Sequence, residues 1–146
     1  MSIRNKRLIK EIPRLEYNLT WDDNWQTKEL AIVKIIRQNM LISISLTHTY
    51  PFHCPVLRVQ GVKYISWFLK ENIKFKQMKD ELNIVLPCIC CYSLTCSWTP
   101  SLGIKDMIQE FDKHYELYQS LLKFHIIYKI ARFDNLIYQK IFQFLY

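Results

Sequence analysis

The sequence predicts a single α+β domain in which one helix precedes a four-stranded antiparallel sheet and further helices follow it. Two patterns carry this prediction. Apolar and polar residues alternate in short β-branched runs between residues 15 and 59, and apolar residues recur every three or four positions after Ile104. The chain has 146 residues, half of them hydrophobic, which is enough to bury one core. We therefore treat residues 1–146 as one domain.

The first predicted element is a basic amphipathic helix that starts at Ile3 and ends near Pro13. Short turns at residues 22–24 and 37–39 separate the first strands, which makes the sheet an antiparallel meander. The predicted strands cover residues 15–21, 29–36, 40–46 and 56–59. Past Tyr64 the strand pattern ends, and residues 66–77 favour a helix or helical loop. The helix from Ile104 is expected against the inner surface of the sheet, with a terminal helix over residues 133–145.

The composition limits the class of partner. A net charge of +7 fits an anionic partner, which could be nucleic acid, a membrane surface or an acidic protein face. Aromatic and basic residues do not interleave, and no recognised nucleic-acid motif occurs. No run of 18 apolar residues and no signal peptide are found, so we expect a soluble protein of the cytoplasm or nucleus. We do not expect nucleic acid or a membrane among its partners.

The five cysteines indicate reduced thiols rather than a disulfide framework. Their number is odd, and four of them lie between Cys88 and Cys96, too close together for orderly pairing. Zinc is an alternative use for them, because thiolates and imidazoles are its ligands. The candidate ligands are His53, Cys54, Cys88, Cys90, Cys91 and Cys96. Cys88 and Cys91 have C-x₂-C spacing, but no second such pair occurs and adjacent cysteines chelate poorly, so we predict no metal site.

Two short motifs stand out in the middle of the chain. Residues 50–56 fit the pattern Y-P-F-x-x-P-V, and residues 89–102 fit I-C-x-x-x-L-x-x-x-W-x-P-x-L. In this order they resemble the core of the ubiquitin-conjugating enzyme family. The resemblance implies the fold of that family, a UBC-like α+β domain, here with an insertion near residues 65–83. The first motif also occurs in the related non-catalytic RWD domains, whereas the spacing from cysteine to tryptophan is typical of the enzymes.

The resemblance assigns a thioester-forming role to Cys90, with Cys91 as the alternative if one residue has been gained or lost. In such enzymes a thiolate accepts the C-terminal acyl group of ubiquitin or a similar modifier from an activating enzyme. A ligase or a substrate lysine then receives the modifier. This chemistry needs no cofactor. The other reading is a catalytically silent variant of the same fold that binds ubiquitin or another protein.

Two features of the family are missing around the cysteine. Family members carry His-Pro-Asn shortly before it, where the Asn stabilises the oxyanion, and no such triplet occurs here. The nearest candidate for this role is Asn83, seven residues before Cys90. The acidic residue two positions after the cysteine is replaced by Tyr92. Because one oxyanion donor is worth about 10²–10³ in rate, we expect slow transfer to lysine rather than no thioester.

The resemblance also implies two binding surfaces. The basic face of the first helix would engage the activating enzyme through Arg4, Lys6, Arg7 and Lys10. The alternative is that these cations form only a solvated helix face. Two loops would meet a ligase through Phe52, Trp98 and Ser101. For Trp98, a place in the buried framework is equally compatible with the pattern.

Overall fold

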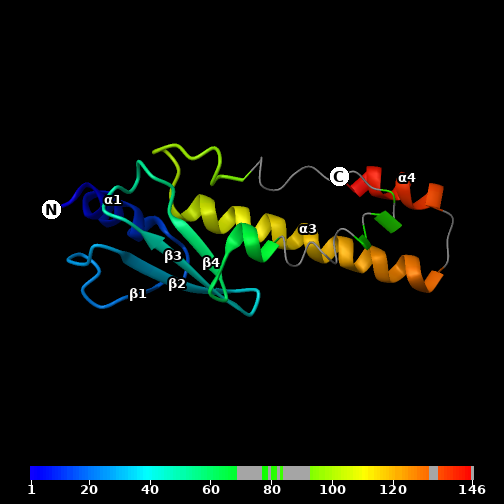
Figure 1. The fold of residues 1–146 in the computed structure, drawn as a ribbon, viewed down its shortest axis with the longest axis horizontal. Helices are drawn as coiled ribbons and strands as arrows, with labels where there is room; N and C mark the ends of the chain where they lie inside the picture. The colour runs from blue at the N-terminus through cyan, green and yellow to red at the C-terminus, as the bar shows by residue number, and fades with distance from the viewer. Residues whose placement is uncertain (69–76, 79, 82, 84–92, 132–134, 146) are drawn as a thin grey trace.

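A computed structural model describes residues 1–68, 77–78, 80–81, 83, 93–131 and 135–145. The chain starts with helix α1 (Ile3–Glu11) and a 3₁₀ turn, η1 (Ile12–Arg14). A sheet follows, then the long helix α3 (Ile104–Ala131) and helix α4 (Asn135–Leu145). Figure 1 shows α1 and the sheet at one end of the molecule, and α3 running from the sheet toward α4 at the other. The predicted α+β class is confirmed.

The sheet is an antiparallel meander of five strands in chain order. Its strands are β1 (Thr20–Trp21), β2 (Ala31–Arg37), β3 (Met40–Leu46), β4 (Val56–Val59) and β5 (Val62–Lys63). The prediction of four strands was wrong because β5 has only two residues, too few to show alternation. Gln60 and Gly61 both have positive φ, which suits the two-residue turn of a tight hairpin. Gln38 and Asn39 form the β2–β3 turn in the same way.

The first strand is shorter than predicted. Only Thr20 and Trp21 pair with β2, although the alternating pattern begins at residue 15. Before them, the chain meets β2 through side chains, since the Arg37 guanidinium lies 5.5 Å from the centre of the Tyr17 ring. The same guanidinium is paired with Asp112 on α3 at 2.5 Å. Arg37 therefore links the chain before β1 to α3.

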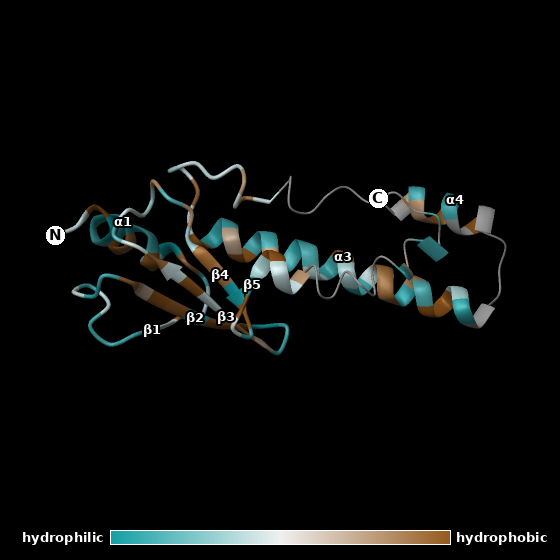
Figure 2. Ribbon diagram, in the orientation of Figure 1, coloured by the Kyte–Doolittle hydropathy of each residue, from teal (hydrophilic) through white to brown (hydrophobic). Residues whose placement is uncertain are grey.

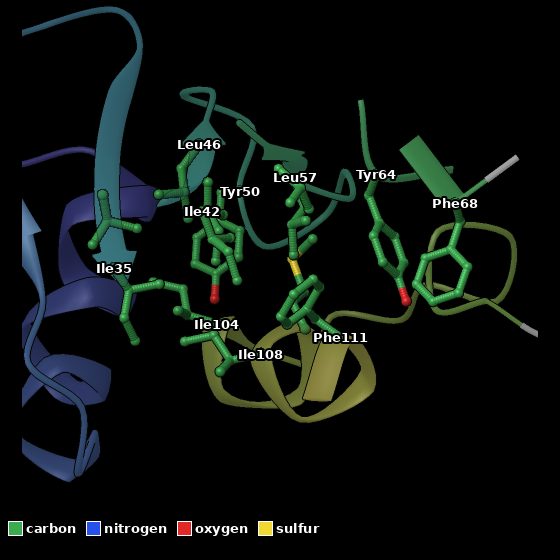
Figure 3. Packing of buried hydrophobic residues seen from close by; sticks show 14 of the residues in the cluster. Ile35, Ile42, Leu46, Tyr50, Leu57, Tyr64, Phe68, Ile104, Ile108 and Phe111 are labelled. Carbon is green, nitrogen blue, oxygen red and sulfur yellow. The ribbon is translucent and has the colours of Figure 1, made fainter. Parts of the chain in front are cut away.

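The core lies between the sheet and the first half of α3. Ile104, Ile108 and Phe111 of α3 are fully buried and face the sheet in Figure 3. Opposite them lie buried residues of the strands and of the following turn, which include Ile35, Ile42, Leu46, Tyr50 and Leu57. This packing confirms that the helix from Ile104 covers the inner surface of the sheet. The apolar spacing on α3 produces it, because residues three and four apart share one helix face.

Helix α4 returns alongside the second half of α3 in the opposite direction (Figure 1). The rings of Phe124 and Phe142 meet edge to face, with centroids 5.9 Å apart. Figure 2 shows hydrophobic and hydrophilic residues alternating along both helices. Within the described ranges, no helix combines the length and hydrophobicity needed to cross a lipid bilayer. About half of the predicted insertion at 65–83, namely residues 69–76, 79 and 82, lies outside the described residues; Ile65 to Phe68, at its start, are helical.

Candidate functional site

The Tyr50–Pro51 turn is fixed to helix α1. Its peptide bond is cis, and the Tyr50 side chain is fully buried. The Tyr50 hydroxyl donates a hydrogen bond to Glu11 Oε2 at 2.6 Å. Burial, and then the hydrogen bond to the Glu11 carboxylate, raise the pKa of Tyr50 well above its ordinary value. The Tyr50 phenol therefore stays protonated, and its hydrogen bond to the Glu11 carboxylate holds the turn of the first motif in place.

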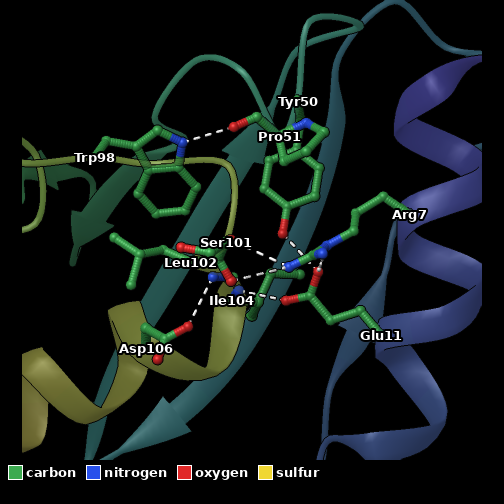
Figure 4. A network of polar contacts seen from close by, with 10 residues as sticks. Arg7, Glu11, Tyr50, Pro51, Trp98, Ser101, Leu102, Ile104 and Asp106 are labelled. Atoms are coloured by element: carbon green, nitrogen blue, oxygen red, sulfur yellow. Dashed lines mark hydrogen bonds and ion pairs between the residues drawn. The ribbon is translucent and has the colours of Figure 1, made fainter.

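Trp98 joins the second sequence motif to the first. Its indole Nε1 donates a hydrogen bond to the Pro51 carbonyl oxygen at 2.7 Å (Figure 4), across 47 positions of sequence. The Trp98 ring also lies near Tyr50, with centroids 6.3 Å apart. Partial burial with a satisfied N–H is the usual arrangement for a structural tryptophan. The described part of the second motif therefore meets the first at Trp98 and Pro51.

Glu11 binds groups from three segments of the chain. Its Oε1 accepts a hydrogen bond from the Ile104 backbone N–H at 2.5 Å, and its Oε2 accepts the one from Tyr50. Ile104 is the first residue of α3, so its N–H has no acceptor within the helix. A carboxylate at this position also complements the helix dipole. Glu11 therefore caps α3 while holding the Tyr50 turn, as Figure 4 shows.

Arg7 adds the loop before α3 to this network. Its Nε lies 3.4 Å from Glu11 Oε2, and its Nη2 donates to the carbonyl oxygens of Ser101 and Leu102, both at 3.3 Å. Gly103 lies against the same carboxylate, and a methyl group on its Cα would collide with Glu11. A side chain here would displace the Glu11 carboxylate from its present contacts. Together, Glu11 and Arg7 tie α1 to the second motif.

Replacing Glu11 with glutamine is expected to lower the free energy of unfolding by about 2–3 kcal/mol, because charged hydrogen bonds are lost and an amide N–H₂ must face a donor. Urea denaturation of the wild type and of Glu11→Gln measures the difference. Glu16→Gln is the matched control, since Glu16 is exposed and such changes stay within about 0.5 kcal/mol. Equal losses in the two variants would show that the Glu11 network contributes little.

The loop after residue 92 is anchored to α3 by Glu110. The Leu94 backbone N–H donates to Glu110 Oε1 at 2.7 Å. Burial raises the pKa of Glu110, and the bond from Leu94 opposes that shift. Ser93 is fully buried, and its side chain and carbonyl oxygens accept hydrogen bonds from Thr95, Cys96 and Ser97. The four residues from Leu94 to Ser97 are therefore fixed immediately before Trp98.

Two cysteines lie in the described ranges, and neither is in a disulfide. Burial, and then the negative charge of Glu110, raise the pKa of the Cys54 thiol to about 11, partly offset by a hydrogen bond with Thr95. Cys54 is therefore a protonated thiol at neutral pH and a poor nucleophile. Cys96 is exposed. Among the described residues, no group of three or more His, Cys, Asp or Glu side chains could hold a metal ion.

The predicted catalytic residues are described in part. Cys90 and its alternative Cys91 lie outside the described residues, as does Cys88. Asn83 is exposed on a turn with a φ of 51°, and its N–H donates to the Asp80 carbonyl oxygen at 3.4 Å. Asparagine is one of the few residues that adopt this left-handed conformation readily. The oxyanion role of Asn83 stays a prediction.

The four predicted cations of α1 have three different environments. Lys6 and Lys10 are exposed, and Arg7 is half-buried against Glu11. Arg4 is only 2% exposed, which differs from the sequence picture of a basic outer face. Its guanidinium donates to four backbone carbonyl oxygens at 2.7–3.1 Å, those of Trp25, Lys28, Glu29 and Leu46. Arg4 therefore supports the fold, while Lys6 and Lys10 face outward.

The predicted ligase-binding residues lie around the Trp98 contact. Phe52 is 60% exposed and follows the Pro51 carbonyl that Trp98 binds. Ser101 is exposed, and its hydroxyl bonds to that of Thr99 at 2.7 Å. The side chains of Phe52 and Ser101 are therefore accessible near Trp98. The Trp98 Nε1–H already donates its hydrogen bond to the Pro51 carbonyl oxygen.

Glu11 and Glu110 were not predicted as anchoring residues, although each leaves a signal in the sequence. Glu11 ends α1, where a negative charge opposes the helix dipole and indicates a partner elsewhere. Glu110 lies three residues after Met107, so it borders the apolar face of α3. An acidic residue in either position points to an anchoring contact.

No family model, curated protein or solved structure matches this chain. The resemblance to ubiquitin-conjugating enzymes therefore depends on the residues of the two motifs. Their meeting at Trp98 and Pro51 is the geometric observation that bears on it.

Proposed function

We propose that the chain is a ubiquitin-conjugating-enzyme-like protein that accepts ubiquitin or a ubiquitin-like modifier as a thioester on Cys90. The observation that supports this proposal is the hydrogen bond from Trp98 to Pro51, which brings together two motifs that resemble the family in sequence. Cys90 precedes Trp98 by eight residues, and the segment before Trp98 is anchored by Glu110.

The proposed reaction transfers the C-terminal acyl group of the modifier twice, first to Cys90 and then to a ligase or a substrate. The Cys90 thiolate attacks the thioester carbonyl that links the modifier to the activating enzyme, and the cysteine of that enzyme leaves as a thiolate. A ligase thiol or a substrate amine then attacks the new thioester and releases the Cys90 thiolate. The exposed Lys6 and Lys10 would contact the activating enzyme, and Phe52 with Ser101 would contact a ligase. The buried and protonated Cys54 is unsuited to the nucleophilic role.

The first test is loading. The protein is mixed with an activating enzyme, ATP and labelled ubiquitin, and the products are separated with and without reductant. We expect an adduct that reductant removes. If no modifier loads while the unmodified protein still binds ubiquitin, the silent binding protein is the correct alternative, as the missing His-Pro-Asn would suggest.

Discharge of the loaded protein tests the role of the missing motif. We expect transfer to free cysteine to outpace transfer to free lysine, because one absent oxyanion donor slows the lysine reaction by about 10²–10³. The two rates are compared at matched pH in the wild type and in Asn83→Ala. Asn18→Ala, at another exposed asparagine, controls for surface substitution. Fast lysine discharge that only Asn83→Ala slows would instead assign the oxyanion role to Asn83.

A further inference from the structure

Helix α4 carries an apolar strip that faces solvent. Ile137, Ile141 and Phe144 are exposed, and Phe144 reaches 92%. Their spacing of four and three residues places them on one side of the helix. Phe142 points elsewhere, because it packs against Phe124 of α3. The strip is therefore separate from the contact that holds α4 in place.

Helix α3 extends this strip. Ile126 and Ile127 are exposed on its second half, on the same helix side as the exposed Lys123. Phe124 and Phe142 mark the side of each helix that contacts the other. Viewed from the N-terminus of each helix, the exposed apolar residues lie roughly a third of a turn from that side, and the rotation has the same direction in both helices. Because the helices are antiparallel, this places both strips on one side of the hairpin. We call it the α3–α4 apolar face, formed by Ile126, Ile127, Ile137, Ile141 and Phe144.

The charge within this face has one sign. Lys123 lies three and four residues before Ile126 and Ile127, and Lys140 lies between Ile137 and Phe144. Neither residues 117–131 nor residues 135–145 contain an aspartate or glutamate. Lys129, on another side of α3, lies 4.0 Å from Glu81. The apolar face therefore offers lysines, and the nearest described acidic residue on that side of α3 is Glu116, two turns before Lys123.

We propose that the α3–α4 apolar face binds the surface of an anionic phospholipid membrane, with both helices lying parallel to it. Apolar side chains would enter the boundary of the acyl chains, while lysine stems lie along them and their ammonium groups reach lipid phosphates. A protein partner fits less well, because lysine is depleted from the centres of protein interfaces. A second copy of the chain would add two more lysines to the same interface.

This binding is compatible with the absence of a spanning helix in the described ranges. A helix that lies in the membrane surface needs one apolar side rather than a long apolar run. The expectation of no membrane partner was based on the absence of a signal peptide and of a long apolar run, and neither is needed by a helix that lies in the membrane surface. The inference is also independent of thioester chemistry, since it uses no residue of the candidate site.

The test is co-sedimentation with vesicles of phosphatidylcholine, alone or with about 30% phosphatidylserine. We expect binding to the anionic vesicles only, weakening as salt is raised. Phe144→Ser and Lys140→Glu should each weaken binding by about tenfold. Ile36→Ser is the matched control, because Ile36 is 73% exposed on β2, away from this face, and should leave binding unchanged. Circular dichroism checks that all variants remain folded.

Equal binding to neutral and anionic vesicles, or none to either, would overturn the inference. So would a wild-type dimer that Phe144→Ser dissociates without any vesicle binding, since that result assigns the face to a second copy. Unmodified protein is used throughout. Failure to bind vesicles therefore leaves ubiquitin loading untouched, and failure to load leaves vesicle binding untouched.

Discussion

Replacing Arg4 with methionine is expected to lower the free energy of unfolding by about 3–5 kcal/mol, a large effect for one residue of a small domain. Methionine keeps much of the apolar stem but donates no hydrogen bonds. The carbonyl oxygens of Trp25, Lys28, Glu29 and Leu46 would each lose a charged donor, the last in a buried place and the others in partly buried ones. Arg4 also fixes the segment before β2, so its loss should loosen that segment first.

Urea denaturation of Arg4→Met and Lys6→Met provides the comparison. Lys6 lies two residues away on the same helix and is exposed, so its replacement should change the free energy of unfolding by less than about 0.5 kcal/mol. Arg4→Lys should recover only part of the loss, because one ammonium cannot match the planar fork of a guanidinium. Similar stabilities for the Arg4→Met and Lys6→Met variants would contradict the structural role of Arg4.

Local patterns were sufficient to predict most of the fold. The alternation in β2 and β3, with Gln38 and Asn39 between them, determines a hairpin because only one register buries the apolar face. The recurrence of apolar residues after Ile104 predicted the helix that covers the sheet. The strand β5 was missed because two residues carry no periodicity. The extent of β1 was overestimated because alternation does not show where pairing with β2 stops.

The contacts around the candidate site were harder to predict. In the sequence, Arg4 looks like one of four cations on a basic helix. Its partners are backbone carbonyl oxygens, which every residue has, so no residue type in the sequence indicates them. Glu11 is similar, since its acceptor role depends on the start of α3, 93 positions away. The meeting of Trp98 and Pro51 could be anticipated only from the order of two motifs. Long-range polar contacts of this kind arise from the assembled fold.

Assigning the loaded residue tests the central claim, that Cys90 carries the modifier. Cys90→Ser and Cys91→Ser are each mixed with activating enzyme, ATP and labelled ubiquitin, and the adducts are treated with reductant. A serine hydroxyl that replaces the reacting thiol forms an oxygen ester, which reductant does not cleave. The account predicts a reductant-resistant adduct on Cys90→Ser and a fully reducible one on Cys91→Ser. A resistant adduct on Cys91→Ser, with reducible loading unchanged in Cys90→Ser, would contradict it.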